Sequence, residues 1–553
     1  MIFKKGFLLI LIRVLLIVAL AFGLVYTLYE TELSITPVVF GVCIFIVTME
    51  LTWRLHSQER NWAHFLQSVK YGDFNRAYQK KTNSKELQEA YELITESMET
   101  LHTNKEAEFR LLQTVLRHVS VAVVCYKADG EVVFAEAFGE KVKGSGETVT
   151  PETLFQLGST TKMFTALATL QLTQEGLLNT DDKLVNTLPN IQYPGVQAIT
   201  WQDISIDDLL THQSGLPDTY IGADSNSSLV EYMSSGYPQQ NMQNNPPGIF
   251  HNYSNPSWSY LGAVVEHITQ TPYIEHIQRD IFEPMGMKRT WMDRSKVVAD
   301  GNYALGFQAN GSEGIFLSDI NQIPLDFVST PAGSETWSTP TQQLKMAEFL
   351  LNGNADILSS ELQSEMTTAK VSTEFAGLPL HYGYGIYVDD GFLHNEQWYP
   401  EKVWQHGGNT LAYSSAFWVL PEKNIAVSIL SSGRGDDFNA TMIAALEAVT
   451  ELPQAQSEPI IPSDSSEYHK HVGTYTSAVA TVIITEVNNQ LHISVPEMDA
   501  ANFPYNDTLI PIGDKTFIFE ADEAVLITFM PAIEGEESVY FVTRDAVGIK
   551  DGY

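Results

Sequence analysis

Two side chains at helical spacing, Ser159 and Lys162, are the residues of this sequence best suited to covalent chemistry. They stand three apart in FQLGSTTKMFTALATLQL, with the serine at the start of a predicted helix. Residues i and i+3 share a helix face, so the lysine amine can reach the serine hydroxyl. A serine becomes a nucleophile when an adjacent base takes its proton, and a desolvated lysine can be that base. The plainer interpretation of the pair alone is a helix-capping serine beside an exposed lysine.

A tyrosine and an asparagine two residues apart supply the next candidate groups. The segment GIFHNYSNPSWSYLGAVVEHI places Tyr253 and Asn255 in a loop just before a predicted helix. A phenol or phenolate can relay the serine proton. An asparagine amide can bridge the lysine and a substrate carbonyl group. The plainer interpretation of Tyr253 is a loop tyrosine packed under its own helix.

A histidine followed by two glycines forms the third motif. VWQHGGNTLAYSSAFWVLP places His406, Gly407 and Gly408 before a predicted strand. The glycines allow a substrate backbone to lie against the edge of that strand. We expect the backbone N–H groups of Ser159 and Asn409 to form an oxyanion hole, which stabilises the charge that develops on the carbonyl oxygen. A turn histidine is the plainer interpretation of His406.

In the order Ser-x-x-Lys, Tyr-x-Asn, His-Gly-Gly, these motifs resemble the serine β-lactamase and penicillin-binding-protein-like family, specifically its class C branch of DD-peptidases, D-aminopeptidases and esterases. The resemblance runs from about 119 to 450. It implies an α+β, two-lobed, β-lactamase/DD-peptidase-like domain in which an antiparallel sheet is flanked by helices. It also implies an acyl-enzyme on Ser159, with Lys162 and Tyr253 as acid–base groups. His212 and Asp218 fall on segments that resemble structural parts of the family, so no chemistry is assigned to them.

One departure from the family pattern bears on the substrate. Class C β-lactamases have a lysine at the start of the third motif, which suits the carboxylate of a β-lactam, whereas this chain has His406. A neutral histidine holds a carboxylate less well. We therefore predict a carboxypeptidase, D-aminopeptidase or esterase that acts on a small ester or a short peptide, and not an efficient β-lactamase.

The elements that must position these groups follow from the apolar pattern. SVAVVCYKADGEVVFAEAFG predicts a hairpin, and SAFWVLP and IAVSILSSG predict two strands joined by a turn. Because predicted helices lie between these strand pairs, we expect the terminal strands to share one sheet. The hydrolase domain is predicted over 119–451. A Pro/Ser/Gln-rich linker (452–466) and an accessory antiparallel β-domain (467–553), a sandwich or a small barrel, are predicted to follow.

The first 118 residues predict a membrane anchor. Phe7–Tyr29 and Leu33–Met49 have the apolar character of two transmembrane helices within residues 1–54. A cleaved signal peptide is the competing interpretation of the first segment. Residues 55–118 predict a helical stalk through which copies of the chain could associate. This region also resembles the membrane input region of a histidine kinase, which suggests an alternative function: a membrane sensor whose hydrolase-like domain binds or is acylated by a ligand.

Charges around the apolar segments predict the topology of a multi-pass protein of a bacterial cell membrane. Basic residues precede the first segment and follow the second, among them Lys4, Lys5 and Arg54. By the positive-inside rule both ends stay in the cytoplasm, and the catalytic domain with them. An extracytoplasmic domain is the alternative, because cell-wall substrates lie outside the cytoplasm.

The composition excludes several classes of function. The chain has 67 acidic and 32 basic residues and a net charge of −35, and 55 of the acidic and 19 of the basic residues fall in 119–553. So acidic a region repels phosphate backbones, which excludes a nucleic-acid partner. The 14 histidines and two cysteines show no metal-binding spacing, so we predict no metal ion and no cofactor.

Overall fold

The structure is a computed structural model that describes residues 121–127, 130–189, 201–216, 218, 228–235, 245–310, 313–322, 331–373, 378–433, 438–477, 480–521, 524–533, 535–543 and 546–553. Before residue 121 it describes five single residues, all helical and exposed: Val18, Val25, Val39, Val42 and Met49. The rest of the two predicted spans and the predicted stalk lie outside the described residues. Within the described ranges, no helix combines the length and the apolar character needed to cross a membrane.

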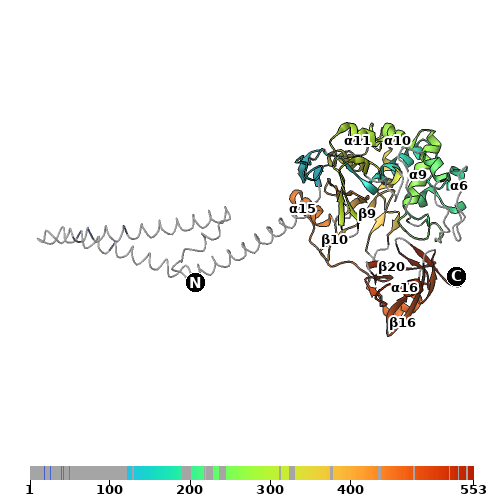
Figure 1. The fold of residues 1–553 in the computed structure, drawn as a ribbon. Helices are drawn as coiled ribbons and strands as arrows, with labels where there is room; N and C mark the ends of the chain where they lie inside the picture. Colours follow the sequence, from blue (N-terminus) through green and yellow to red (C-terminus); the bar gives the residue numbers. More distant parts are fainter. Residues whose placement is uncertain are drawn as a thin grey trace. The chain divides into compact units, whose positions relative to one another are not determined.

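The chain divides into two units, Met1–Thr114 and Val115–Tyr553, and all the elements below belong to the second. Within its described residues, an antiparallel sheet forms the centre of the hydrolase domain (Figure 1). It has eight described strands in the order β2-β1-β14-β13-β12-β9-β8-β7. Its strands are β1 (Val121–Lys127), β2 (Val132–Phe138), β7 (Val371–Ser372), β8 (His381–Tyr382), β9 (Tyr387–Asp389), β12 (Val403–Asn409), β13 (Ser414–Leu420) and β14 (Ile425–Ser431). Val124 of β1 lies opposite Ser428 of β14. The prediction that strands from both ends of the domain share a sheet is confirmed.

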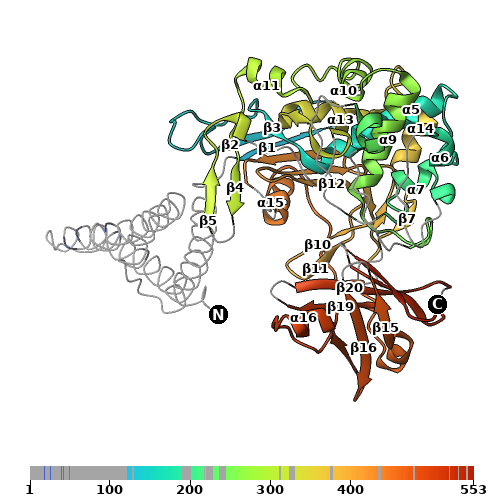
Figure 2. The same ribbon diagram turned by 45° about the vertical axis from the view of Figure 1, so that its right-hand side comes forward.

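Helices cover both faces of this sheet (Figure 2). The main ones are α5 (Lys162–Gln174), α7 (Ile206–Leu210), α9 (Asn255–Thr269), α12 (Pro331–Ser334), α13 (Pro340–Asn352), α14 (Ser360–Met366) and α15 (Asn439–Val449). Val124 and Tyr126 of β1 pack into the larger core with α5 and α9. Val123 and Cys125 point the other way and pack against α15. Because both faces are covered, every residue of β13 and β14 is buried, which explains why both strands are mostly apolar and contain no charged residue.

A second antiparallel sheet forms the β-domain, in the order β17-β16-β15-β22-β21-β20-β19-β18. Its strands are β15 (Gly473–Thr476), β16 (Thr481–Val487), β17 (Gln490–Ser494), β18 (Ile510–Pro511), β19 (Thr516–Glu520), β20 (Ala524–Pro531), β21 (Ser538–Val542) and β22 (Val547–Lys550). The N–H of Leu509 donates to the carbonyl of Leu491, and the N–H of Ile493 donates to the carbonyl of Asp507. These bonds join the segment before β18 to β17 and close the sheet into a barrel.

The β-domain packs on the loop that carries Tyr253. Phe250 is only 4% exposed and clusters with Met530, Val539 and Tyr540 of the β-domain. The rings of Phe250 and Tyr540 lie edge to face with their centroids 5.4 Å apart. Since Phe250 precedes Tyr253 by three residues, the β-domain supports the loop from which this candidate site residue projects.

We expect Phe250→Ala to loosen the β-domain from the hydrolase domain, because removing a buried phenyl ring costs about 3–5 kcal/mol. Limited proteolysis of the full-length protein measures this as faster cleavage in the linker at 452–466. Phe503→Ala, at a phenylalanine that is 42% exposed, is the matched control and should leave the cleavage rate unchanged. An unchanged rate in Phe250→Ala would contradict the contact.

Among the histidines buried in the two domains, His212, His406 and His471 are 0%, 2% and 5% exposed. Burial disfavours the charged imidazolium. It lowers the pKa of His406 to about 3 and that of His471 to about 4. The pKa of His212 falls well below 6.5 for the same reason. All three are therefore neutral in the folded protein at pH 5–7.

These histidines predict a loss of stability in mild acid. Below their unfolded pKa of about 6.5, the unfolded chain binds protons that the folded chain does not. Each histidine then lowers the free energy of unfolding by up to about 1.4 kcal/mol per pH unit as the pH falls toward the folded pKa. Urea unfolding of the full-length protein between pH 7 and 5 should show this slope, and His471→Asn should reduce it. A slope that is the same in His471→Asn as in the wild type would show that His471 titrates normally in the fold.

Candidate active site

Ser159 and Lys162 lie where a short turn becomes a helix. Ser159 belongs to a single 3₁₀ turn, Gly158–Thr161, which leads directly into α5 at Lys162. The serine is partly exposed, whereas the lysine is 0% exposed. The interpretation of Lys162 as an exposed lysine is therefore wrong. Its Nζ lies 3.1 Å from Ser159 Oγ, as the i, i+3 spacing predicts.

The amine of Lys162 is held by acceptors from two further segments. It donates to Asn255 Oδ1 at 2.7 Å and to the carbonyl oxygen of Gly333 in α12 at 3.2 Å. An amide oxygen and a backbone carbonyl oxygen can only accept. In a neutral amine these two acceptors would take both N–H hydrogens, which leaves the nitrogen lone pair toward Ser159 Oγ. This arrangement suits removal of the serine proton.

Tyr253 and Asn255 are brought to the same place. Asn255 is the first residue of α9 and is 2% exposed, so the helix begins within the Tyr-x-Asn motif and not after it. Lys162 Nζ lies 5.1 Å from the centroid of the Tyr253 ring. Ser159, Lys162, Tyr253 and Asn255 therefore converge in the described part of the chain.

The third motif lies inside a strand, whereas the sequence predicted that it would lie just before one. His406 to Asn409 form the end of β12, because pairing with β13 continues as far as Asn409 opposite Ser414. On the other edge, the pairing of β9 with β12 covers only Val403–Gln405. The motif thus lies beyond the stretch that β9 covers.

Glycine is required where β12 meets the turn of Ser159. A Cβ atom on Gly408 would lie 2.0 Å from the carbonyl oxygen of Leu157 and 2.9 Å from the nitrogen of Ser159. A Cβ atom on Gly158, whose φ is +60°, would lie 2.8 Å from the nitrogen of Asn409. The two glycines thus let the amides of Ser159 and Asn409 approach each other. Their role as an oxyanion hole stays a prediction.

His406 is buried and both of its ring nitrogens are engaged. Nδ1 lies 2.6 Å from the carbonyl oxygen of Gly407, which can only accept, so Nδ1 carries the proton. Nε2 then accepts from the hydroxyl of Tyr382 at 3.1 Å. Burial raises the pKa of Tyr382 far above 10, so this hydroxyl stays protonated. His406 has no spare N–H with which to hold a substrate carboxylate.

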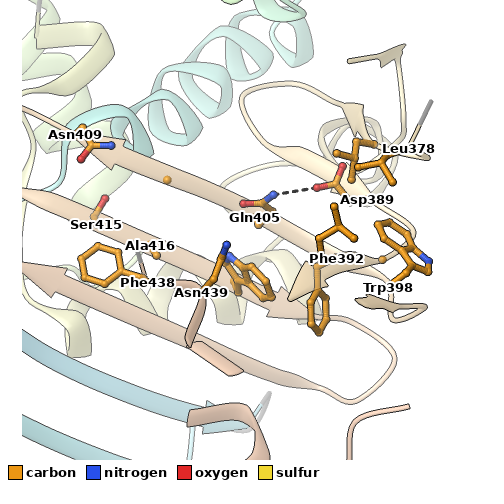
Figure 3. Close-up of a pocket in the computed structure, with 15 residues that line it drawn as sticks. Leu378, Asp389, Phe392, Trp398, Gln405, Asn409, Ser415, Ala416, Phe438 and Asn439 are labelled. Atoms are coloured by element: carbon orange, nitrogen blue, oxygen red, sulfur yellow. Dashed lines mark hydrogen bonds between the residues drawn. The ribbon is translucent and has the colours of Figure 1, made fainter. Parts of the chain in front are cut away.

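Gly407 and the side chain of Asn409 lie on the face of β12 opposite to that of His406 and Gly408. They line a cavity of about 340 Å³ behind the strand, together with Asp389, Gln405 and Trp418 (Figure 3). Gln405 donates to Asp389 Oδ2 at 3.0 Å. Burial raises the pKa of Asp389 to about 7. This contact ties β12 to β9 at the point where their backbone pairing stops.

Sequence reasoning missed several groups around the site. The carbonyl of Gly333 carries no side-chain signal, and Tyr382 stands far from His406 in the chain. His212 and Asp218 contact Tyr253 and Asn255 respectively, although no chemistry was assigned to them. Their only signal was their place in THQSGLPD, one of the segments that resemble the family.

Comparisons with known proteins agree with this geometry. A family model described as Beta-lactamase matches residues 108–451, more than half of the chain. The chain is 24% identical over 449 residues to penicillin-binding protein 4* of Bacillus subtilis strain 168, covering 73% of this chain and 91% of that protein. It is 23% identical over 374 residues to protein flp of Staphylococcus aureus strain MW2, covering 66% and 70% of the two chains.

Solved structures share the fold. SurE matches with a TM-score of 0.58 and 19% identity over 80% of this chain and 98% of that one. The octameric penicillin-binding protein homologue of Pyrococcus abyssi matches with a TM-score of 0.52 and 22% identity, over 81% of this chain and 100% of that one. Fold, motif geometry and family match agree, and the chain belongs to the β-lactamase and penicillin-binding-protein-like family of serine hydrolases.

Proposed function

We propose that the protein forms an acyl-enzyme on Ser159 and hydrolyses a small ester or a short peptide-like amide. The observation that carries this proposal is the buried amine of Lys162, which lies 3.1 Å from Ser159 Oγ and also donates to Asn255 Oδ1 and the Gly333 carbonyl. A base held in this way is ready to take the serine proton.

The reaction proceeds in two halves. Ser159 Oγ attacks the substrate carbonyl carbon as its proton passes to Lys162 Nζ. The oxyanion accepts hydrogen bonds from the N–H groups of Ser159 and Asn409. Tyr253, whose ring lies beside the Lys162 amine, relays the proton to the leaving alcohol or amine, and the C–O or C–N bond breaks. A water molecule then attacks the ester on Ser159, returns a proton to the serine oxygen through the same groups and releases the acid.

Two features favour substrates without a carboxylate next to the scissile bond. His406 is neutral and has both nitrogens engaged, so it offers no charge for such a group. The net charge of −35 also repels anionic substrates. We infer that esters and D-amino-acid amides or peptides are better substrates than β-lactams.

We expect Ser159→Ala to abolish turnover of p-nitrophenyl esters and D-amino-acid amides by the full-length protein, because the acyl-enzyme cannot form. Lys162→Met should lower kcat by about 10²–10⁴-fold, the usual contribution of a general base. Steady-state assays measure both effects, and labelling with a fluorescent penicillin reports acylation directly.

Ser145→Ala, at an exposed loop serine, is the control and should retain full activity. Turnover that survives Ser159→Ala would overturn the assignment of the nucleophile. Stable labelling without any turnover would favour the sensor over the hydrolase.

We further propose that the two apolar segments, Phe7–Tyr29 and Leu33–Met49, anchor the protein in a bacterial cell membrane with the catalytic domain in the cytoplasm. The proposal rests on hydropathy and on flanking basic residues such as Lys4, Lys5 and Arg54. In that location peptidoglycan cannot be the substrate, and a cytoplasmic ester or peptide takes its place.

The full-length protein should stay with membranes after an alkaline carbonate wash, because transmembrane helices resist extraction, whereas a chain lacking residues 1–54 should not. Protease added to intact spheroplasts should spare the catalytic domain, and permeabilisation should expose it. Cleavage in intact spheroplasts would place the domain outside the cytoplasm. Release of the full-length protein by carbonate would contradict the anchor itself.

A further inference from the structure

His212 accepts hydrogen bonds from the backbone on both sides of Tyr253. It follows α7 and has a φ of +59°, in the left-handed region that histidine and asparagine tolerate better than most residues. Its carbonyl oxygen accepts from the N–H of Asn252 at 2.9 Å. Its Nδ1 accepts from the N–H of Ser254 at 2.8 Å. The residues immediately before and after Tyr253 are thus both bonded to His212.

The imidazole of His212 also holds the ring of Tyr253. The two rings are stacked, with centroids 4.1 Å apart and planes 25° from parallel. The indole N–H of Trp258, in α9, points at His212 Nε2 from 3.1 Å. A neutral imidazole accepts at one nitrogen and so satisfies one of these two N–H donors, whereas a protonated ring would satisfy neither. His212 thus presents an uncharged ring face to the tyrosine, whose ring centroid lies 5.1 Å from Lys162 Nζ.

Asp218 orients the amide of Asn255 in a comparable way. Its Oδ1 accepts from Asn255 Nδ2 at 2.8 Å and from the Asn255 backbone N–H at 3.2 Å. With the NH₂ group turned toward Asp218, the amide oxygen is left to accept from Lys162 Nζ at 2.7 Å. The opposite orientation would turn an N–H donor toward the lysine amine.

Further contacts join the segment that carries these two residues to the loop of Tyr253. Ser214 Oγ lies 2.8 Å from Ser257 Oγ, which donates to Ser254 Oγ at 3.0 Å. Gly215 has a φ of +74°, and a Cβ atom there would lie 2.1 Å from the carbonyl oxygen of Asn245. The segment after α7 therefore lies directly against the loop that begins α9.

We propose that His212 and Asp218 are positioning residues for the proposed reaction: His212 fixes the ring of Tyr253 beside the Lys162 amine, and Asp218 fixes the amide orientation of Asn255. This inference rests on the proposed serine-hydrolase function. Proton relay requires the phenol oxygen at a defined place, and misplacement of a reacting group by about 1 Å can cost 10²-fold in rate.

The substitution His212→Asn tests the stacking. Asparagine tolerates the left-handed backbone and its amide oxygen can replace Nδ1 as the acceptor for Ser254, but it has no ring to stack on Tyr253. In the full-length protein we expect kcat for a p-nitrophenyl ester to fall by about 10–100-fold while KM changes less than about threefold, because positioning acts on the reacting groups and not on substrate binding.

His471→Asn is the matched control, because it removes an imidazole that is equally buried but lies in the β-domain. It should lower the melting temperature and leave kcat unchanged. A wild-type kcat in His212→Asn would overturn the role of His212. An equal loss of kcat in His471→Asn would show that general destabilisation is responsible, which would also overturn it.

Asp218→Ala and Asp218→Asn test the second contact. The alanine variant leaves the Asn255 amide free to rotate, so kcat should fall by about tenfold or more. The asparagine variant keeps an oxygen in place of Oδ1, so it should restore most of the loss. Failure of Asp218→Asn to restore activity would show that the negative charge matters and the acceptor does not, which contradicts the proposed role.

Ser159→Ala distinguishes a failure of the positioning proposal from a failure of the proposed hydrolase function. If Ser159→Ala is inactive while the His212 and Asp218 variants match the wild type, the positioning proposal fails and the hydrolase remains. If Ser159→Ala keeps its activity, the proposed function fails.

Discussion

A lysine amine removed from solvent, with hydrogen-bonding partners on three sides, is the constraint on which the rest of the hydrolase domain depends. Lys162 is 0% exposed, and its contacts come from the turn before α5, from the start of α9 and from α12. Burying an amine costs free energy unless its hydrogen bonds are replaced. The helical lobe must therefore bring three segments that are distant in sequence to one nitrogen atom.

The sheet approaches this cluster mainly through the backbone of β12. At the end of β12, Gly408 allows the strand to approach the carbonyl of Leu157, and Gly158 allows the turn to approach Asn409. Strand β13 keeps β12 in place through pairing that runs from Trp404 to Asn409. The side chain of Ser415 adds a hydrogen bond to the carbonyl of Leu157 at 2.6 Å. Any side chain at position 408 would push the strand away from Ser159.

The buried polar side chains that surround the Lys162 amine are mostly uncharged. His406 and His212 are both buried beside the lysine, and burial lowers the pKa of each. The hydroxyl of Tyr382 stays protonated and donates to His406. The negative charge of the chain is thus carried by its surface, whereas the groups that surround the Lys162 amine are mostly uncharged hydrogen-bonding partners.

Local chemistry was enough to predict part of this protein from its sequence. Helical spacing places Ser159 beside Lys162, and apolar runs predict β1, β13 and β14, because these features depend on neighbours in the chain. The three motifs in order predicted the family, which the family model matches over 108–451. The chemistry of Ser159, Lys162 and Tyr253 stays a prediction until it is measured.

Other features were decided only by the tertiary structure. No sequence pattern shows that a backbone carbonyl at Gly333 meets Lys162, that Tyr382 engages His406, or that His212 stacks on Tyr253. Whether Lys162 is a helix-surface lysine or a buried base was also open from spacing alone. These contacts join segments tens to hundreds of residues apart, and packing, not local preference, determines which of them meet. The sequence therefore determined the types of candidate groups and their local spacing, whereas the packing of the lobes determined their burial, partners and orientation.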